Sequence, residues 1–197
     1  MATAKFLAAV CMVRLTLTAI AAAFDSPEVY VASHNDVRAE YGVGPVTWNQ
    51  TLASYAQVSA NSAITTCEMR QSSSGPYGQN YLVEPETAIT EELAVTYWAS
   101  ESEFYDYSSK KCVGGECGHF KAVVWRDTES IGCAMANCKK YMLFITCNYY
   151  PPVGVFTGRG LCTAVAMGAS GQKSTENLMQ LKLMNEFKIV HQHYRQD

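Results

Sequence analysis

The chain has 197 residues, of which 48% are hydrophobic, 17% charged and 11% aromatic, and its formal net charge is −3. This length suits one domain with a sizeable core, and the apolar and aromatic content excludes disorder across the whole chain. The acidic balance argues against a nucleic-acid-binding surface, and the sequence contains neither a Gly-rich phosphate loop nor a dinucleotide fingerprint, so nucleotide chemistry has little support.

Residues 1–23 have the pattern of a secretory signal peptide, because Lys5 precedes a mostly apolar run that ends in small residues at 21–23. The alternative, a retained membrane anchor, is weakened by Arg14 inside the apolar run. No later segment reaches the roughly 20 apolar residues that a bilayer span needs, so we expect a secreted protein without stable membrane insertion. The sequon at 49–51 fits such a protein and predicts N-glycosylation at Asn49.

Secretion makes the cysteines disulfide candidates before metal ligands, and their spacing is not that of zinc knuckles. Cys11 leaves with the signal peptide, and seven remain: Cys67, Cys112, Cys117, Cys133, Cys138, Cys147 and Cys162. Because seven is odd, one cysteine has no partner. We read Cys162 either as an unpaired buried residue or as the site of an intermolecular disulfide.

Three helices are predicted in the first half of the chain. The first begins at Ser26-Pro27-Glu28, buries one face, and ends at Gly42 and Pro45; its inward positions are Tyr30, His34, Val37 and Tyr41. The second covers about 50–66, with Leu52, Tyr55, Ala56, Ser59, Ala60 and Ala63 facing inward. A loop is predicted over 71–80. The third helix covers about 86–104 and carries Ile89, Leu93, Tyr97 and Glu101 at spacing i, i+4, with Ala94 and Trp98 beside them.

In the second half of the chain, the sequence predicts a loop rich in Gly and Ser and a short helix over 119–125. Two strands follow, over 130–136 and 141–150, around a tight turn. A hairpin centred near residue 140 places Cys133 opposite Cys147, close enough for a disulfide. Cys138 in the turn can then reach Cys67, while Cys112 and Cys117 can close a local loop. The sequence alone does not fix these last two pairings. Residues 158–197 are loosely patterned and form either a late amphipathic helix or a tail outside the compact domain.

Several motifs, in order, resemble one family. The run CGHFKAVVWRDTESIGCAMANC and the later FITCNYYPP resemble the two signatures of plant pathogenesis-related class 1 proteins, in the superfamily of cysteine-rich secretory proteins and antigen 5. The segments SHNDVRAEYGVGPVTWN, GPYGQN and YWASESEFYDYSSKKCVGGECGH are similar to the same family, so that the match covers about 25–156. The resemblance implies an α+β fold, a disulfide-stapled three-layer α-β-α sandwich with a mainly antiparallel sheet. The domain then occupies 24–157, and 158–197 is a divergent extension.

The resemblance also implies a central cavity lined by two histidines and two acids. These map to His34, His119 and Glu101, whereas Gln79 stands where relatives have the second acid. An amide neither accepts a proton nor binds a cation as a carboxylate does. Three readings remain: a hydrogen-bond cluster that orients helices and needs no cofactor, a weak zinc site with an open fourth position, or a catalytic centre. Neither HExxH nor GxSxG occurs.

A second candidate site is the loop with Phe104, Tyr105 and Tyr107, because the corresponding loop of relatives is linked to sterol binding. Aromatic walls with one polar group suit a sterol; the alternative is that these rings cap the core. Relatives can release a C-terminal signalling peptide from CNYxPxGNxxGxxPY, but CNYYPPVGVFTGRGLC lacks the GN pair and the final PY, so peptide release is not expected here.

We therefore expect a monomeric, extracellular plant defence protein of the apoplast that binds sterols or related lipids and acts against pathogens without turnover. The alternatives are a zinc-assisted hydrolase that uses His34, Glu101 and His119, and a defence-signalling protein that binds a pathogen or receptor protein and no small molecule.

Overall fold

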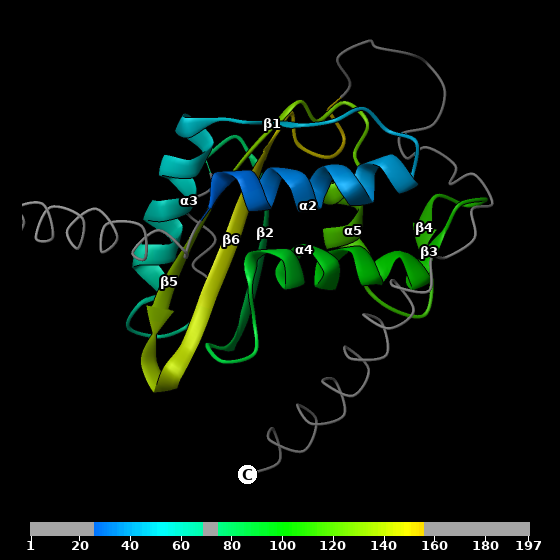
Figure 1. The fold of residues 1–197 in the computed structure, drawn as a ribbon. Coiled ribbons are helices and arrows are strands. Elements are labelled where there is room, and N and C mark those ends of the chain that lie inside the picture. The colour runs from blue at the N-terminus through cyan, green and yellow to red at the C-terminus, as the bar shows by residue number, and fades with distance from the viewer. Residues whose placement is uncertain (1–25, 69–74, 156–197) are drawn as a thin grey trace, which may run out of the picture.

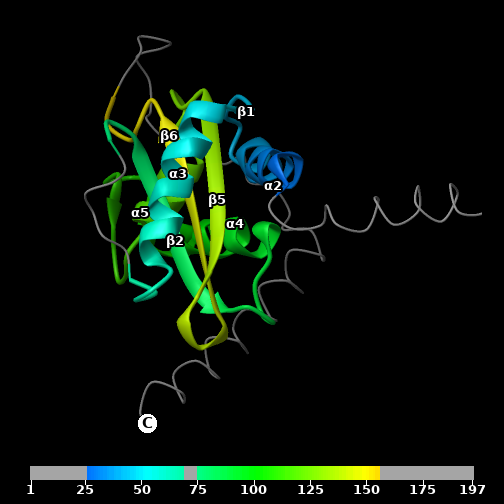
Figure 2. The same cartoon turned by 90° about the vertical axis from the view of Figure 1, so that its left-hand side faces the viewer.

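The computed structural model describes residues 26–68 and 75–155. The expected signal peptide, the extension over 158–197 and Cys162 lie outside these residues. A four-stranded sheet, in the order β1-β5-β6-β2, forms the middle layer. Helix α3 (Gln50–Ala63) covers one face, and α2 (Pro27–Glu40), α4 (Glu91–Ser100) and α5 (Gly118–Val123) cover the other (Figure 1, Figure 2). The predicted three-layer α+β fold is confirmed.

The sheet is mixed. Strand β1 (Thr47–Trp48) runs parallel to β5 (Ser130–Cys138), whereas β6 (Met142–Tyr150) is antiparallel both to β5 and to β2 (Gly78–Pro85). The β5–β6 hairpin turns through the 3-10 helix η3 (Lys139–Tyr141) and pairs Cys133 with Cys147, as predicted. Within the described part of the chain, no helix is long and apolar enough to cross a bilayer.

Strand β2 occupies the end of the segment for which we predicted only a loop. Its eight residues pair in register with β6, from Gly78 opposite Tyr149 to Pro85 opposite Met142. The sequence GQNYLVEP shows no regular alternation of apolar and polar residues, so the local pattern does not indicate a strand. Strand β2 forms because its backbone N–H and C=O groups pair with the edge of β6, and this pairing does not require a particular side-chain pattern.

Helices α3 and α4 begin at residues whose side chains cap them, and both are shorter than predicted. Asn49 caps α3, since its Oδ1 accepts hydrogen bonds from the N–H groups of Thr51 and Leu52. Thr90 caps α4 four residues later than the predicted start. After α4 the chain tightens into the 3-10 helix η2 (Glu101–Phe104). The buried positions of α4 are Glu91, Ala94, Val95 and Trp98, so its inward face is rotated from the predicted one.

Arg38 is buried on the inner face of α2 and holds neighbouring loops in place. Its guanidinium donates to the carbonyl oxygens of Gly44, Val123, Trp125 and Thr128 at 2.7 to 3.1 Å. Burial lowers the pKa of this side chain to about 10, so Arg38 stays charged at neutral pH. Four carbonyl partners satisfy the buried guanidinium, because each accepts one of its N–H groups.

All three predicted disulfides are present: Cys67–Cys138, Cys112–Cys117 and Cys133–Cys147. The first ties the segment after α3 to the end of β5. The second follows the short strands β3 (Tyr105–Asp106) and β4 (Lys111–Cys112), which pair with each other, and ends at the start of α5.

Candidate functional site

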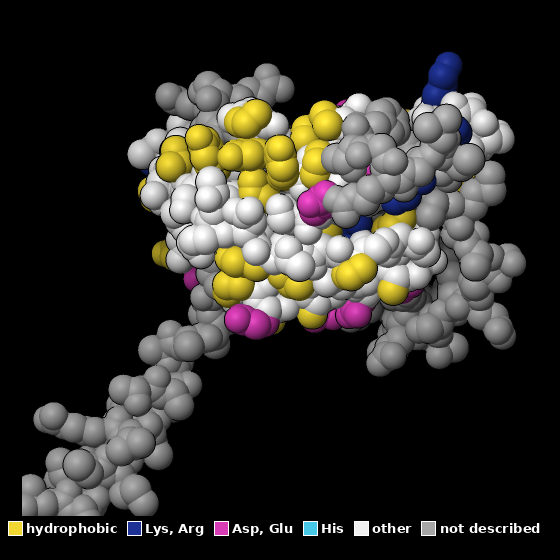
Figure 3. Space-filling view, turned by 90° about the horizontal axis from the view of Figure 1, so that it is seen from above, with side chains coloured by type: hydrophobic (Ala, Val, Ile, Leu, Met, Phe, Trp, Pro, Cys, Tyr) yellow, Lys and Arg dark blue, Asp and Glu magenta, His cyan; other side chains and the backbone are white. Residues whose placement is uncertain are grey.

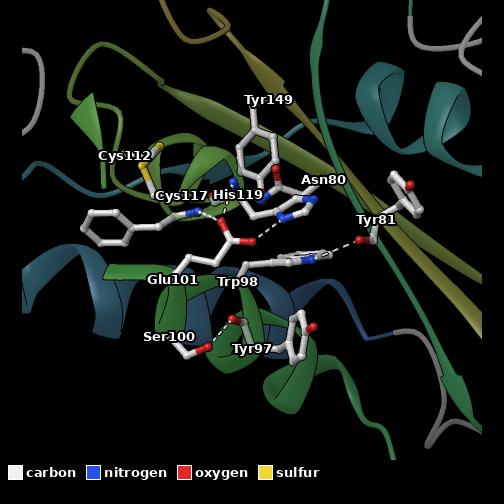
Figure 4. Close-up of polar contacts among 11 residues, drawn as sticks. Asn80, Tyr81, Tyr97, Trp98, Ser100, Glu101, Cys112, Cys117, His119 and Tyr149 are labelled. Carbon is white, nitrogen blue, oxygen red and sulfur yellow. Dashed lines mark hydrogen bonds and ion pairs between the residues drawn. A yellow bond between two sulfur atoms is a disulfide. The ribbon is translucent and has the colours of Figure 1, made fainter. Parts of the chain in front are cut away.

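Glu101 and His119 form a directly bonded pair between α4 and α5. The Oε1 atom of Glu101 lies 2.6 Å from Nδ1 of His119 (Figure 4). Its Oε2 atom accepts hydrogen bonds from the backbone N–H groups of His119 at 2.9 Å and Phe120 at 3.2 Å. Cys117, the residue before α5, makes no side-chain cap, so the Glu101 carboxylate satisfies N–H groups that the start of α5 leaves open.

This pair keeps contact with solvent, since both side chains are only partly buried. The Tyr81 ring stands edge-on to His119, with 6.3 Å between ring centroids. A carboxylate bonded to one imidazole nitrogen fixes the orientation of the ring. Chemically, the arrangement can orient an imidazole and move a proton.

His34 is fully buried and lies apart from this pair in a hydrogen-bond network of its own. Its Nδ1 atom is 2.8 Å from the carbonyl oxygen of Tyr30, which can only accept, so Nδ1 carries the hydrogen. Its Nε2 atom lies 3.0 Å from the hydroxyl of Tyr149 and accepts that hydrogen. Burial, together with the smaller effect of the Arg38 charge, lowers the pKa of His34 to about 4, so the ring is neutral at neutral pH.

Asn80 and Tyr149 connect the two histidines. The Asn80 amide donates to the carbonyl oxygen of His119 and to the Tyr149 hydroxyl, both at 3.1 Å. Burial raises the pKa of Tyr149, which keeps the phenol protonated as a donor to His34. Sequence reasoning missed both residues. The available signal for Asn80 was the period of two along a strand, which places residues 79 and 80 on opposite faces.

Gln79 has no described hydrogen bond to His34, Glu101 or His119. Its Nε2 donates to the hydroxyls of Ser59 at 3.1 Å and Thr146 at 3.0 Å, on the face that α3 covers. Those hydroxyls in turn donate to the carbonyl oxygens of Tyr55 and Asn80. The amide therefore points its NH₂ group toward them, and Asn80, its neighbour on β2, takes the cavity side.

The expected zinc set of His34, Glu101 and His119 does not fit a metal. A ligating imidazole must present a free lone pair, but one nitrogen of His34 carries a hydrogen and the other accepts from Tyr149. Among residues 26–68 and 75–155, no group of three or more His, Cys, Asp or Glu side chains could hold a metal ion. The structure brings together Glu101 and His119 only.

The aromatic loop forms a cluster against the end of α2. Tyr105 is buried; its ring lies 4.8 Å from Tyr107 and 5.7 Å from Phe120 between centroids. Tyr41 of the chain after α2 stands edge-on to Phe120 at 4.9 Å. Phe104 and Tyr107 pack on the core but keep part of their surface exposed. Of the three predicted lipid-contacting residues, only Phe104 and Tyr107 thus present rings to the outside.

Comparison with known proteins shows what the chain resembles. The model of the cysteine-rich secretory protein family matches residues 31–149. The basic form of pathogenesis-related protein 1 of Nicotiana tabacum is 47% identical over 135 residues, which are 68% of this chain and 75% of that protein. Pathogenesis-related leaf protein 4 of Solanum lycopersicum is 41% identical over 149 residues, 75% of this chain and 91% of the relative.

Solved structures match at the level of the fold. Venom allergen-like protein 4 of Schistosoma mansoni superposes with a TM-score of 0.52 at 23% identity, over 76% of this chain and 96% of that one.

Proposed function

The chain belongs to the cysteine-rich secretory protein family, and on that premise we propose that it is a secreted plant defence protein that binds a sterol or related lipid without turning over a substrate. Its relatives in tobacco and tomato are named as pathogenesis-related proteins, which supports the role in plant defence. The expected signal peptide supports secretion.

The aromatic cluster beside the Cys112–Cys117 disulfide is the observation that best supports lipid binding. The loop lies directly on the Phe104 ring: a Cβ atom on Gly115 would come within 2.7 Å of it. The N–H group of Val113 donates to the carbonyl oxygen of Phe104, and the Val113 side chain is 61% exposed. A disulfide-closed loop therefore presents an exposed aliphatic side chain next to partly exposed aromatic rings, which is the wall an apolar ring system needs.

The same cluster contains a polar group that suits a sterol hydroxyl. Burial raises the pKa of Tyr107, and the nearby Tyr41 raises it further through charge and a side-chain hydrogen bond. Two neutral phenols at the rim of an apolar surface can accept and donate one hydrogen bond each to an incoming alcohol.

The test is equilibrium binding of tritiated ergosterol to the secreted, oxidised protein. We expect saturable binding that Val113→Asp weakens by about tenfold or more, because a carboxylate would lose its water on contact with the lipid. Tyr107→Phe keeps the ring and removes the hydroxyl, so it should weaken ergosterol but not its 3-deoxy analogue.

His119→Ala is the matched control, since it removes a partly exposed ring outside the aromatic cluster. Equal loss of binding in His119→Ala and Val113→Asp would assign the lipid to another place on the protein, and an absence of saturable binding to the folded wild type would refute the proposal.

A further inference from the structure

Helix α3 and the chain beside its beginning contain no formally charged residue. Helix α3 contains no Asp, Glu, Lys or Arg in its 14 residues. The two segments beside its beginning, residues 75–79 and 148–155, contain none either. Helices α2 and α4 on the opposite face, in contrast, hold several acidic side chains and the buried Arg38. In the view from above, hydrophobic side chains gather over the upper left part of the molecule, with an acidic group near the centre (Figure 3).

Three tyrosines from these three segments form a row. Tyr77, before β2, stands edge-on to Tyr55 of α3 at 5.0 Å and to Tyr150 at the end of β6 at 6.0 Å, between ring centroids. Tyr55 is 39% exposed and Tyr150 is 50% exposed. We call Tyr55, Tyr77 and Tyr150 the tyrosine row. Edge-to-face contacts fix the rings relative to one another, so the row is preformed.

Hydroxyl and amide groups continue this surface along the outer side of α3. The exposed or half-exposed polar positions that follow the first turn are Ser54, Gln57, Asn61 and Ser62. Each of these side chains can donate and accept hydrogen bonds while remaining neutral. Val58, also exposed, lies on the same helix.

We propose that the tyrosine row and the outer side of α3 bind a neutral polysaccharide. The apolar C–H faces of sugar rings pack on exposed tyrosine rings, and sugar hydroxyls exchange hydrogen bonds with neutral hydroxyls and amides. An uncharged ligand matches an uncharged surface, since no ion loses its hydration on contact.

The same surface suits other partners less well. An anionic membrane attracts Lys and Arg, which these three segments lack. Protein-binding surfaces are enriched in Arg beside Tyr and Trp, and the three segments contain neither Arg nor Trp. The site lies across the sheet from the Glu101–His119 pair and is distinct from the aromatic loop.

The test is calorimetric titration of the full chain with linear neutral oligosaccharides, a β-1,3-linked glucose hexamer and a β-1,4-linked N-acetylglucosamine hexamer. Asn49 begins α3 and is an expected glycosylation site, so all proteins carry Thr51→Ala, which removes the sequon and leaves the Asn49 cap intact. We expect at least one hexamer to bind, and Tyr55→Ala/Tyr150→Ala to weaken it by about tenfold or more.

Two further variants separate binding from folding. Tyr141→Ala removes a tyrosine that is 87% exposed on the hairpin turn, outside the tyrosine row, and should leave the affinity unchanged. Ser54→Glu adds one charge to the surface without touching the core and should weaken the hexamer while circular dichroism stays native. The proposal fails if neither hexamer binds the folded chain, or if the double variant binds as tightly as its parent. It also fails if sedimentation shows that the double variant alters the self-association of the chain while hexamer binding stays the same.

Discussion

The carboxylate of Glu101 accepts three contacts at once: the imidazole of His119 and two backbone N–H groups at the start of α5. Removing it leaves these donors without their partner. We therefore expect Glu101→Ala to lower the free energy of unfolding by about 1 to 2 kcal/mol, as loss of a helix cap does.

Urea unfolding at neutral pH measures this change. The matched control is Glu116→Ala in the loop before α5, where the exposed carboxylate should matter by less than about 0.5 kcal/mol. Equal effects of the two substitutions would show that Glu101 does not cap α5.

His34 predicts how stability depends on pH. Burial lowers its pKa in the folded state to about 4, below the usual value of 6.5. Between these values the unfolded chain binds the proton and the folded chain does not, so this contribution is present above pH 6.5 and is lost as the pH falls toward 4. We expect the loss of this contribution to lower the free energy of unfolding by about 3 kcal/mol between pH 6.5 and pH 4.

Urea midpoints from pH 4 to 7 test the contribution, with His34→Gln as the variant. The difference between wild type and His34→Gln should grow as the pH rises, whereas His119→Gln should keep the His34 contribution. A constant difference across the window would mean that His34 is not held neutral in the core.

For individual residues, the sequence identified the polar side chains on apolar faces but not their hydrogen-bond partners. The sequence suggested that His34, Glu101 and His119 partner one another; in the structure Glu101 bonds His119, whereas His34 has partners of its own. The separation of His34 from the other two depends on Tyr149 and Asn80, which lie 115 and 46 residues away in the chain. The partners of Gln79 could not be read from the sequence, because the strand that sets the direction of its side chain was not predicted.

The close packing of α3 against the sheet requires a residue without a side chain on β5. A Cβ atom on Gly132 of β5 would come within 2.1 Å of the backbone nitrogen of Ala53, and backbone cannot yield as a side chain can. We expect Gly132→Ala to displace α3 and to lower the free energy of unfolding by about 3 kcal/mol, the upper range for overpacking.

Thermal or urea unfolding measures this, with Gly44→Ala as control, because a Cβ there meets no atom within 4 Å and its φ is not positive. Native stability in Gly132→Ala would show that α3 sits farther from β5 than the structure has it.

The elements divide into those that the sequence specifies locally and those that need a partner. Helices α2 and α3 follow from caps and spacing, and the β5–β6 hairpin follows from its turn. Strand β2 exists because β6 offers an edge, and Tyr55 is exposed because α3 contacts the sheet mainly through small residues, among them Ala56 and Ala60. A tyrosine at helical spacing is indistinguishable in the sequence from a core residue until that contact is known.

For the whole molecule, the sheet separates two chemically different surfaces. One side holds the histidines, Glu101 and the aromatic loop, and the other holds the uncharged tyrosine row. Substitutions that alter lipid binding and substitutions that alter polysaccharide binding therefore fall on opposite sides of the sheet, and each set serves as a control for the other.

The disulfides connect these layers to different extents. Cys67–Cys138 spans 71 residues and ties the α3 layer to the sheet, whereas Cys112–Cys117 spans 5 and closes only the loop before α5. Because a cross-link restricts the unfolded chain more when its loop is longer, we expect Cys67→Ala/Cys138→Ala to lose about 4 kcal/mol of unfolding free energy and Cys112→Ala/Cys117→Ala about 2 kcal/mol. Urea unfolding of both variants gives the order.

Ergosterol binding should respond in the opposite order, since only the short disulfide shapes the loop beside Phe104. The Cys112→Ala/Cys117→Ala variant should lose ergosterol binding while it is still folded. The Cys67→Ala/Cys138→Ala variant should retain binding under all conditions in which it is folded. If both variants lost stability and binding in proportion, the loop would have no role beyond the general stability of the domain.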